Sequence, residues 1–267
     1  MTNPQYTHGH QDSVLRSHRW RTAQNSAGYL LPHLASGLSL LDIGCGPGTI
    51  TSDLADLVAP GAVWGVDSSA EVVAEASRTA KARGAANASF GVGDVYALAH
   101  ADGAFDVVHA HQVLQHLADP AAALREMGRV CRPGGIVAAR DADYAAMAWF
   151  PRVPALDDWM TLYQQVARSN AAEPDGGRFL RHWAHRAGFA DVTSSASVWC
   201  YSTEAERQWW GGLWADRVVG SAFAAQAVNR GFADVARLQA MAAGWREWAS
   251  HPDAWFAVLN GEILCRR

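Results

Sequence analysis

The sequence contains little cysteine. Its four cysteines lie far apart and form no CxxC pair: Cys45, Cys131, Cys200 and Cys265. Zinc sites and disulfide frameworks both need cysteines at characteristic spacings. We therefore expect reduced thiols and no bound metal.

The sequence also lacks a strong net charge and a long apolar run. The formal net charge is -4 with histidine neutral, which provides no positive field for nucleic acid or an anionic membrane. No apolar run approaches the roughly 20 residues that span a bilayer. The start of the chain shows neither an apolar signal core nor a lipidation signal. We expect a cytoplasmic protein without a nucleic-acid or membrane partner.

Apolar residues, in contrast, are plentiful. They make up 49% of the 267 residues, which suits one globular domain with an appended subdomain. Tryptophan is unevenly distributed: of twelve, only Trp20 and Trp64 precede residue 149. The two halves of the chain therefore have different roles.

Short β-rich runs alternate with alanine-rich helical stretches between residues 39 and 140. This alternation predicts a parallel sheet wrapped by helices, an α/β fold. The expected strands are 38–44, 62–67, 88–93, 105–111 and 135–141, and the expected helices are 48–59, 69–84 and 119–131.

The segments outside this alternation are expected to flank the sheet. Residues 1–37 would form an extended start and lid helices, with a helical stretch over 13–34. Further helices are expected at 154–169 and 177–187, and an insertion of helices over 203–250. Strand-like residues 191–202 and 256–267 would pair antiparallel at the sheet edge. The core then spans 38–202, and residues 251–267 return to it as the last strand.

The stretch LDIGCGPGTIT places Gly44, Gly46 and Gly48 between the first strand and the first helix. A glycine-rich turn at this place lets the backbone approach a ligand. Asp42 precedes the turn at the strand tip, where it either faces the ligand or caps the helix. The pattern lacks the third glycine or alanine of a dinucleotide-binding turn.

Two more acids follow strand ends. Asp67 ends the second strand, where nucleotide-binding folds place an acid that accepts both ribose hydroxyls. Asp94 follows the third strand, where it suits the adenine amine. Together they indicate an adenosine ligand.

With these motifs in order, residues 38–140 resemble the class I S-adenosylmethionine (SAM)-dependent methyltransferases. LDIGCGPG resembles the family's first motif, GVDSSAEVVAEA the second-strand acid and its helix, and LREMGRVCRPGGIV the turn before the fifth strand. QVLQHLADP is most similar to the small-molecule branch that includes ubiquinone and menaquinone C-methyltransferases, although Gln115 replaces the first histidine of a common His-His pair. The resemblance implies a Rossmann-like, doubly wound, mostly parallel sheet of seven strands.

The resemblance also assigns roles to the cofactor-binding candidates. It implies that the three glycines line the methionine part of SAM, that Asp67 holds the ribose and that Asp94 and Val95 hold the adenine. His111 and Gln112 would form the floor beside the sulfonium. The remaining candidates are Asp42, Cys45, Ser68 and Arg21, whose guanidinium would bind the amino-acid carboxylate.

The catalytic candidates are His116, His111 and Asp141. His116 follows the fourth strand, at the ligand-binding edge of the sheet, and a histidine suits proton transfer; the alternative is that it packs against the next helix. His109 and His111 alternate on one strand, as metal ligands do, but no third ligand is placed by spacing. Asp141, Asp143 and Tyr144 follow the fifth strand and are either substrate contacts or solvated loop residues.

Aromatic residues supply the other candidates. Tyr6 would be a lid aromatic above the cofactor. Trp209, Trp210, Trp214 and Phe223, with Trp149 and Phe150, would bury against the main domain, roof a pocket for an apolar or aromatic acceptor, or form a homodimer seam. The Gly211-Gly212 pair weakens the prediction of one continuous helix there.

The expected function is transfer of a methyl group from SAM to carbon, oxygen or nitrogen of a small, largely apolar molecule. Two alternatives stay open. One is a SAM-binding protein without transfer activity, and the other is an NAD-dependent dehydrogenase.

Overall fold

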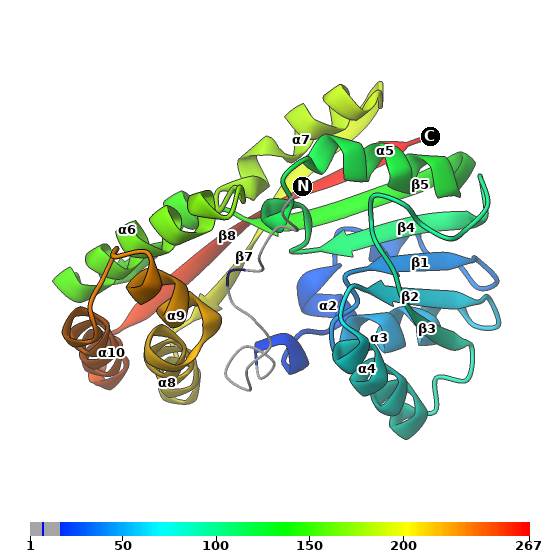
Figure 1. Cartoon of the computed structure of the whole chain (residues 1–267). Helices are drawn as coiled ribbons and strands as arrows, with labels where there is room; N and C mark the ends of the chain where they lie inside the picture. Colours follow the sequence, from blue (N-terminus) through cyan, green and yellow to red (C-terminus); the bar gives the residue numbers. More distant parts are fainter. Residues whose placement is uncertain (1–6, 8–16) are drawn as a thin grey trace.

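The structure, a computed structural model, describes residue 7 and residues 17–267. Its centre is an eight-stranded sheet with helices on both faces (Figure 1). The strands are β1 (Leu40–Ile43), β2 (Val63–Asp67), β3 (Ala88–Val92), β4 (Phe105–His111), β5 (Cys131–Ala142), β6 (Ala148–Phe150), β7 (Asp191–Tyr201) and β8 (Trp255–Arg266). The helices are α2 (Ala23–Ser26), α3 (Thr49–Val58), α4 (Ala70–Arg83), α5 (Pro120–Val130), α6 (Pro154–Ser169), α7 (Gly176–Ala187), α8 (Glu204–Gly220), α9 (Ala222–Asn229) and α10 (Val235–Ser250), and the 3-10 turns are η1 (Leu31–His33), η2 (Leu114–His116) and η3 (Tyr144–Ala146).

The strand order is β3-β2-β1-β4-β5-β8-β6, and β7 also pairs with β8. Strands β1 to β5 are parallel, whereas β8 runs antiparallel to β5, β6 and β7. From β1, the strands are added toward one edge as far as β3, and β4 then lies on the other side of β1. A doubly wound sheet has its ligand crevice at this change of order, between β1 and β4. The α/β prediction and all seven predicted strands are confirmed. The eighth strand, β6, was missed because three residues show no recognisable period.

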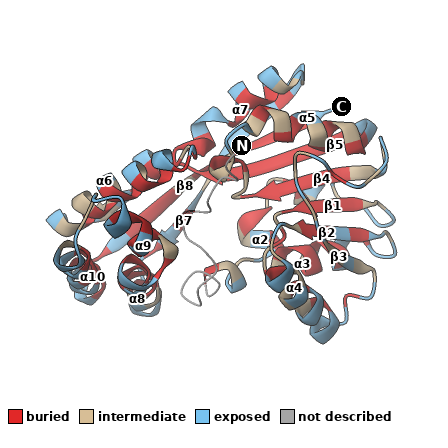
Figure 2. Cartoon of the chain, viewed as in Figure 1, coloured by how far each residue is buried: buried red, intermediate tan, exposed pale blue. Residues whose placement is uncertain are grey.

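Alternate residues of the strands face two different helical layers. Leu41 packs in a cluster with residues of α5 and α7, whereas its neighbour Leu40 packs with residues of α2, α3 and α4. These helices lie on opposite faces of the sheet in Figure 1, and buried residues run along the strands between them in Figure 2. This two-sided burial holds the strand tips in fixed positions.

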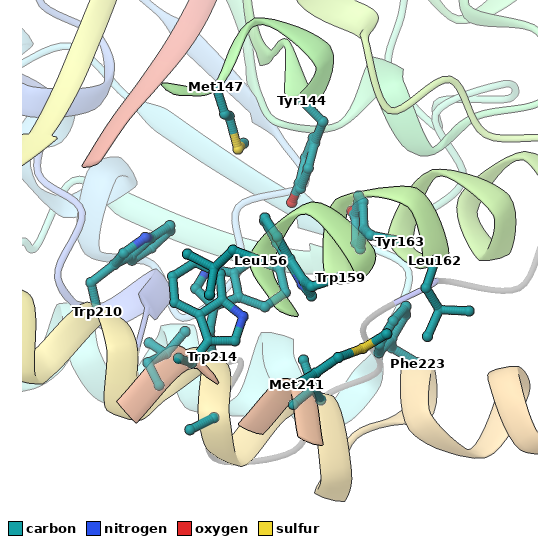
Figure 3. Close-up of a cluster of buried hydrophobic side chains, with 14 of the residues drawn as sticks. Tyr144, Met147, Leu156, Trp159, Leu162, Tyr163, Trp210, Trp214, Phe223 and Met241 are labelled. Carbon is teal, nitrogen blue, oxygen red and sulfur yellow. The ribbon is translucent and has the colours of Figure 1, made fainter. Parts of the chain in front are cut away.

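The predicted insertion between the last two strands consists of α8, α9 and α10. Together with α6, these helices enclose a cluster of aromatic side chains that includes Trp159, Trp214 and Trp245. Figure 3 shows Trp159 and Trp214 within it. Contrary to the expectation from the glycine pair, α8 is continuous through Gly211 and Gly212. A Cβ at Gly211 would lie 2.7 Å from the Ala249 Cβ, so this glycine allows α8 and α10 to pack closely.

The N-terminal segment differs from the predicted lid helices. Among the described residues, the region predicted as one helical stretch is divided into helical residues 17–19, the four-residue α2 and the turn η1. Thr22 caps α2 and exchanges hydrogen bonds with Asn25, so a new short helix begins here. Tyr6 and the extended start lie outside the described residues.

No helix within residues 17–267 has both the length and the apolar character that membrane crossing needs.

Candidate active site

A cavity of about 580 Å³ lies at the carboxyl ends of the parallel strands. One part of its wall, the cradle, comes from the loops that follow β1 to β4. The other part, the aromatic end, comes from the last residue of β5 and the chain after it, and consists of Ala142, Tyr144, Met147, Trp199, Trp210, Trp214, Arg217 and Val258. Ser17, His18 and Arg21 close the wall from the N-terminal segment. Segments far apart in sequence therefore surround a single space.

The three glycines of the cradle differ in what surrounds them. A Cβ at Gly44 would lie 2.4 Å from Val113 Cγ2, and one at Gly48 would lie 3.0 Å from Ala76, so the protein itself fills those positions. Among the described residues, a Cβ at Gly46 would meet a single atom, His18 Nδ1, at 4.0 Å. Gly44 and Gly46 line the cavity, whereas Gly48, which was expected to line it, does not. Of the three glycines, Gly46 is the one that the described chain leaves open to a ligand.

Asp42 lines the cavity, and each of its carboxylate oxygens has a partner within the protein. Its Oδ2 accepts a hydrogen bond from Thr51 Oγ1 at 2.5 Å, and its Oδ1 lies 2.8 Å from His109 Nδ1. These contacts tie β1 to α3 and to β4. Among the described residues, no group of three His, Cys, Asp or Glu side chains is arranged to hold a metal ion. His109 is thus part of a structural pair with Asp42.

The carboxylate of Asp67 is held at the cavity wall by backbone amides. Asp67 accepts hydrogen bonds from Gly46 N at 3.2 Å and from Ser69 N at 3.1 Å. These bonds fix its carboxylate beside the open space at Gly46. Asp94 accepts from Tyr96 N at 2.9 Å. Asp67, Ser68, Asp94 and Val95 all line the cavity, and their contacts with an adenosine stay a prediction.

Arg21 and Gln112 meet across the cradle. Arg21 Nη2 donates to Gln112 Oε1 at 2.6 Å, although the residues come from the N-terminal segment and the end of β4. Gln112 has a φ of 53°, a left-handed conformation that is strained for a residue with a side chain. Such strain is often found at functional sites. Here it turns the chain from β4 along the cavity wall.

Both candidate histidines line the cavity and hold depressed pKa values. Burial, with help from Arg21, lowers the pKa of His116 to about 3. Burial, followed by Arg21 and Arg140, lowers the pKa of His111 well below its ordinary value. Neither nitrogen of the buried His111 ring has a hydrogen-bond partner within the described chain. Both imidazoles are therefore neutral at physiological pH.

Cys45 also lines the cavity, and burial raises the pKa of its thiol far above the ordinary range. It is therefore a protonated, inert thiol.

Asp141 does not line the cavity, contrary to the expectation that it faces the pocket. Its side chain is buried on the opposite side of β5 from the lining residue Ala142, because successive strand residues point to opposite faces. Burial raises its pKa to about 7, against the opposing effect of the backbone amides of Gln115 and its neighbours. Asp143 forms an ion pair with Arg178 and is also remote, whereas Tyr144 reaches the cavity.

Some of the aromatic candidates line the cavity, and the others are buried in the core or exposed. Trp210 and Trp214 line the cavity, whereas Trp209 packs against Trp20 and Tyr201. Phe223 is buried in the aromatic cluster of Figure 3. Trp149 stacks on Phe256, and Phe150 is exposed. The insertion therefore supplies both core and cavity wall.

Trp199 and Arg217 are cavity residues that the sequence analysis did not single out as site residues. The Trp199 indole N–H donates to the Asn25 carbonyl at 2.6 Å, and Arg217 Nη2 donates to Ser17 Oγ at 2.9 Å. The signals for them were weak: a tryptophan in an alternating strand, and an arginine on the same helical face as Trp210 and Trp214.

The doubly wound sheet has its cavity at the point where the strand order reverses, which is where sheets of this class bind nucleotide cofactors. Residues 34–204 match the family model described as a methyltransferase domain. Since the match covers more than half of the chain, the chain belongs to this family. It is a SAM-dependent methyltransferase with SAM as its cofactor, so the dehydrogenase alternative is wrong.

Its relatives agree. The chain is 34% identical to an uncharacterized methyltransferase of Schizosaccharomyces pombe, over 98% of this chain and 96% of that protein. It is 39% identical to the ubiquinone/menaquinone biosynthesis C-methyltransferase UbiE of Bdellovibrio bacteriovorus, over 38% of this chain and 43% of that one. Among solved structures, the YcgJ protein of Bacillus subtilis shares the fold with a TM-score of 0.58 at 19% identity, covering 90% of this chain and 97% of that chain.

Proposed function

We propose that this enzyme transfers the methyl group of SAM by in-line displacement to carbon, oxygen or nitrogen of a small, largely apolar or aromatic molecule. The observation that carries the proposal is the single cavity in which the cradle and the aromatic end face one space. A cavity of about 580 Å³ suits small ligands rather than a macromolecule. The match to UbiE, named for quinone biosynthesis, favours the same class of acceptor.

The cradle fits the cofactor, and we assign its residues accordingly. The open space at Gly46 would receive the methionine part of the cofactor. Asp67, whose carboxylate is oriented by two backbone amides, would accept hydrogen bonds from the ribose hydroxyls. Asp94 and Val95 would hold the adenine. Arg21 would bind the amino-acid carboxylate, since a guanidinium pairs well with that group. SAM supplies a methyl group already activated by the positive sulfur.

The chain's own contribution to catalysis is mainly orientation. Holding two reactants in line is worth up to about 10 kcal/mol in favourable systems. His111 and His116 are neutral at physiological pH, so they would position the acceptor through hydrogen bonds. Asp141, buried away from the cavity, would have no direct part in the reaction.

A transfer assay tests this function. Purified enzyme with methyl-labelled SAM would be incubated with three acceptor classes: small phenols and aromatic acids, bulk tRNA, and a histone peptide. We expect label only on the small molecules. Label on tRNA or peptide alone would contradict the proposal, and tight SAM binding with no transfer to any class would favour the non-catalytic alternative. The homodimer and the cytoplasmic location stay predictions.

A further inference from the structure

Gln115 is a buried polar residue that does not itself line the cavity. It belongs to the turn η2, directly before the cavity residue His116, and is 2% exposed. Its backbone carbonyl accepts a hydrogen bond from Glu173 N at 2.9 Å. A Cβ at Gly176, the first residue of α7, would lie 2.7 Å from the Gln115 Cβ, so α7 packs directly against this side chain. Contacts with other segments therefore hold Gln115 in place.

The orientation of the Gln115 side-chain amide follows from its partners. The backbone nitrogen of Ala142 donates to Gln115 Oε1 at 2.9 Å. A backbone N–H can only donate, so the amide must present its oxygen at this point. The rotated amide would set two N–H donors against each other at a buried position, which is costly. The amide nitrogen Nε2 therefore lies on the other side, 3.1 Å from Nε2 of His116.

This contact determines which nitrogen of His116 carries the proton. A side-chain amide nitrogen donates and does not accept, so His116 Nε2 must turn its lone pair toward Gln115. A neutral imidazole has one N–H, which is then on Nδ1. A second proton, on Nε2, would face the amide N–H. The neutral state of the ring agrees with this geometry, since burial and Arg21 lower the pKa of His116 to about 3.

We propose that Gln115 is a positioning residue for methyl transfer, which holds His116 as the Nδ1–H tautomer so that His116 serves the acceptor as a hydrogen-bond donor and not as a base. The inference rests on the proposed function and deepens it. A ring nitrogen removes a proton through its lone pair, and the Nε2 lone pair already accepts the bond from Gln115. In the transfer, the acceptor atom bonds to the methyl carbon, the carbon–sulfur bond breaks with its electrons left on sulfur, and any acceptor proton passes to solvent.

The tautomer can be measured directly by nuclear magnetic resonance on the full chain labelled with nitrogen-15 histidine. The ring nitrogen shifts, and their couplings to the ring protons, distinguish a protonated from an unprotonated nitrogen. The chain has 11 histidines, and the spectrum of His116→Asn identifies the signals of His116 by their loss. We expect the Nδ1–H form at about pH 7, with and without S-adenosylhomocysteine. The Nε2–H form or a doubly protonated ring in the unmodified protein overturns the proposal.

A second spectrum tests whether Gln115 is the cause. Gln115→Met keeps a side chain of similar length without the amide, so His116 should lose its single tautomer and populate the Nε2–H form as well. The matched control is Gln226→Met, because Gln226 is also buried and its amide accepts from Asn170 and donates to the Thr7 carbonyl. This control should leave the His116 signals unchanged. A folded Gln115→Met variant with only the Nδ1–H form overturns the proposal, and thermal unfolding shows whether each variant is folded.

Gln115→Glu gives opposite kinetic results for the two roles of His116. One carboxylate oxygen would accept from Ala142 N, and the other would accept the proton of His116 Nε2, as a buried carboxylate does when it orients a histidine base. The ring spectrum identifies the pH at which this Nε2–H form is present, and kcat is compared there with the unmodified enzyme. The acceptor is the phenol with the highest activity in the transfer assay.

The proposal expects kcat of Gln115→Glu to fall about tenfold, because the hydrogen bond from His116 to the acceptor is lost. An unchanged or higher kcat overturns it, since a base would be retained or improved by the carboxylate. The proposed function fails separately, if no small molecule is methylated. The ring spectrum of His116 is measured without any transfer, so it tests the tautomer even in that case.

Discussion

Replacing Gly46 by alanine should separate cofactor binding from folding. The residue has a φ of 55°, and among residues 7 and 17–267 the atom nearest to an added Cβ is His18 Nδ1, at 4.0 Å. The left-handed backbone makes alanine cost about 1 to 2 kcal/mol of stability. The methyl group would also occupy the space proposed for SAM, and overpacking of this kind costs about 1 to 3 kcal/mol. We therefore expect S-adenosylhomocysteine to bind about tenfold more weakly or worse.

Gly84 offers a matched control for this prediction. It ends α4 with a φ of 75°, and no atom of the described residues lies within 4 Å of a Cβ built there. Gly84→Ala should therefore lose a similar stability in urea unfolding while binding S-adenosylhomocysteine normally in calorimetry. If Gly46→Ala, once shown to be folded, binds the ligand as tightly as Gly84→Ala does, the space at Gly46 is not the cofactor site and the reasoning is refuted.

Three further predictions concern titratable side chains. Asp67→Ala should weaken S-adenosylhomocysteine binding well over tenfold in calorimetry, because two charge-assisted hydrogen bonds to ribose are lost. The control variant Asp56→Ala, at an exposed residue of α3, should bind normally. Equal affinities of the two variants for S-adenosylhomocysteine would refute the ribose assignment. His116→Ala should lower kcat with little change in SAM affinity. Because the pKa of His116 is about 3, kcat of the unmodified enzyme should show no change controlled by this histidine between about pH 5 and 8. A pH-dependent change in kcat over this range that is absent in His116→Ala would contradict this. Asp141 keeps its proton in the folded protein up to a pKa of about 7 but loses it near pH 4 when unfolded, so it should cost the protein up to about 1.4 kcal/mol of stability per pH unit as pH rises through that window. Asp141→Asn should flatten this loss in urea unfolding, and an unchanged slope would refute the buried-acid interpretation.

Much of the cradle was predictable because strand ends and glycine turns are local features. Asp67 and Gly46 were found from their positions relative to β-rich runs, and the parallel sheet brings such strand ends together. The same argument overreached at Asp141. One residue of error in the phase of β5 exchanges a cavity-facing side chain for a buried one, and Ala142, its neighbour, is the residue that lines the cavity.

The aromatic end could not be predicted in the same way. Trp199 reaches the cavity only because β7 pairs with β8, and Arg217 only because α8 packs with a particular rotation against the rest of the insertion. Strand pairing and helix rotation are determined by tertiary packing, which leaves no local sequence pattern. The continuous course of α8 through Gly211 shows the same principle, since packing against α10 outweighs the low helix propensity of glycine.

The bond between the Trp199 indole and the Asn25 carbonyl joins residues 174 positions apart. During synthesis on the ribosome, Asn25 emerges long before its partner, and β8, which holds β7 in register, emerges later still. The nascent chain can form the cradle of its cavity early, but the aromatic end closes only after β8 has been translated. A truncated product would therefore retain the recognisable cofactor motifs while lacking an intact wall for the molecule to be methylated.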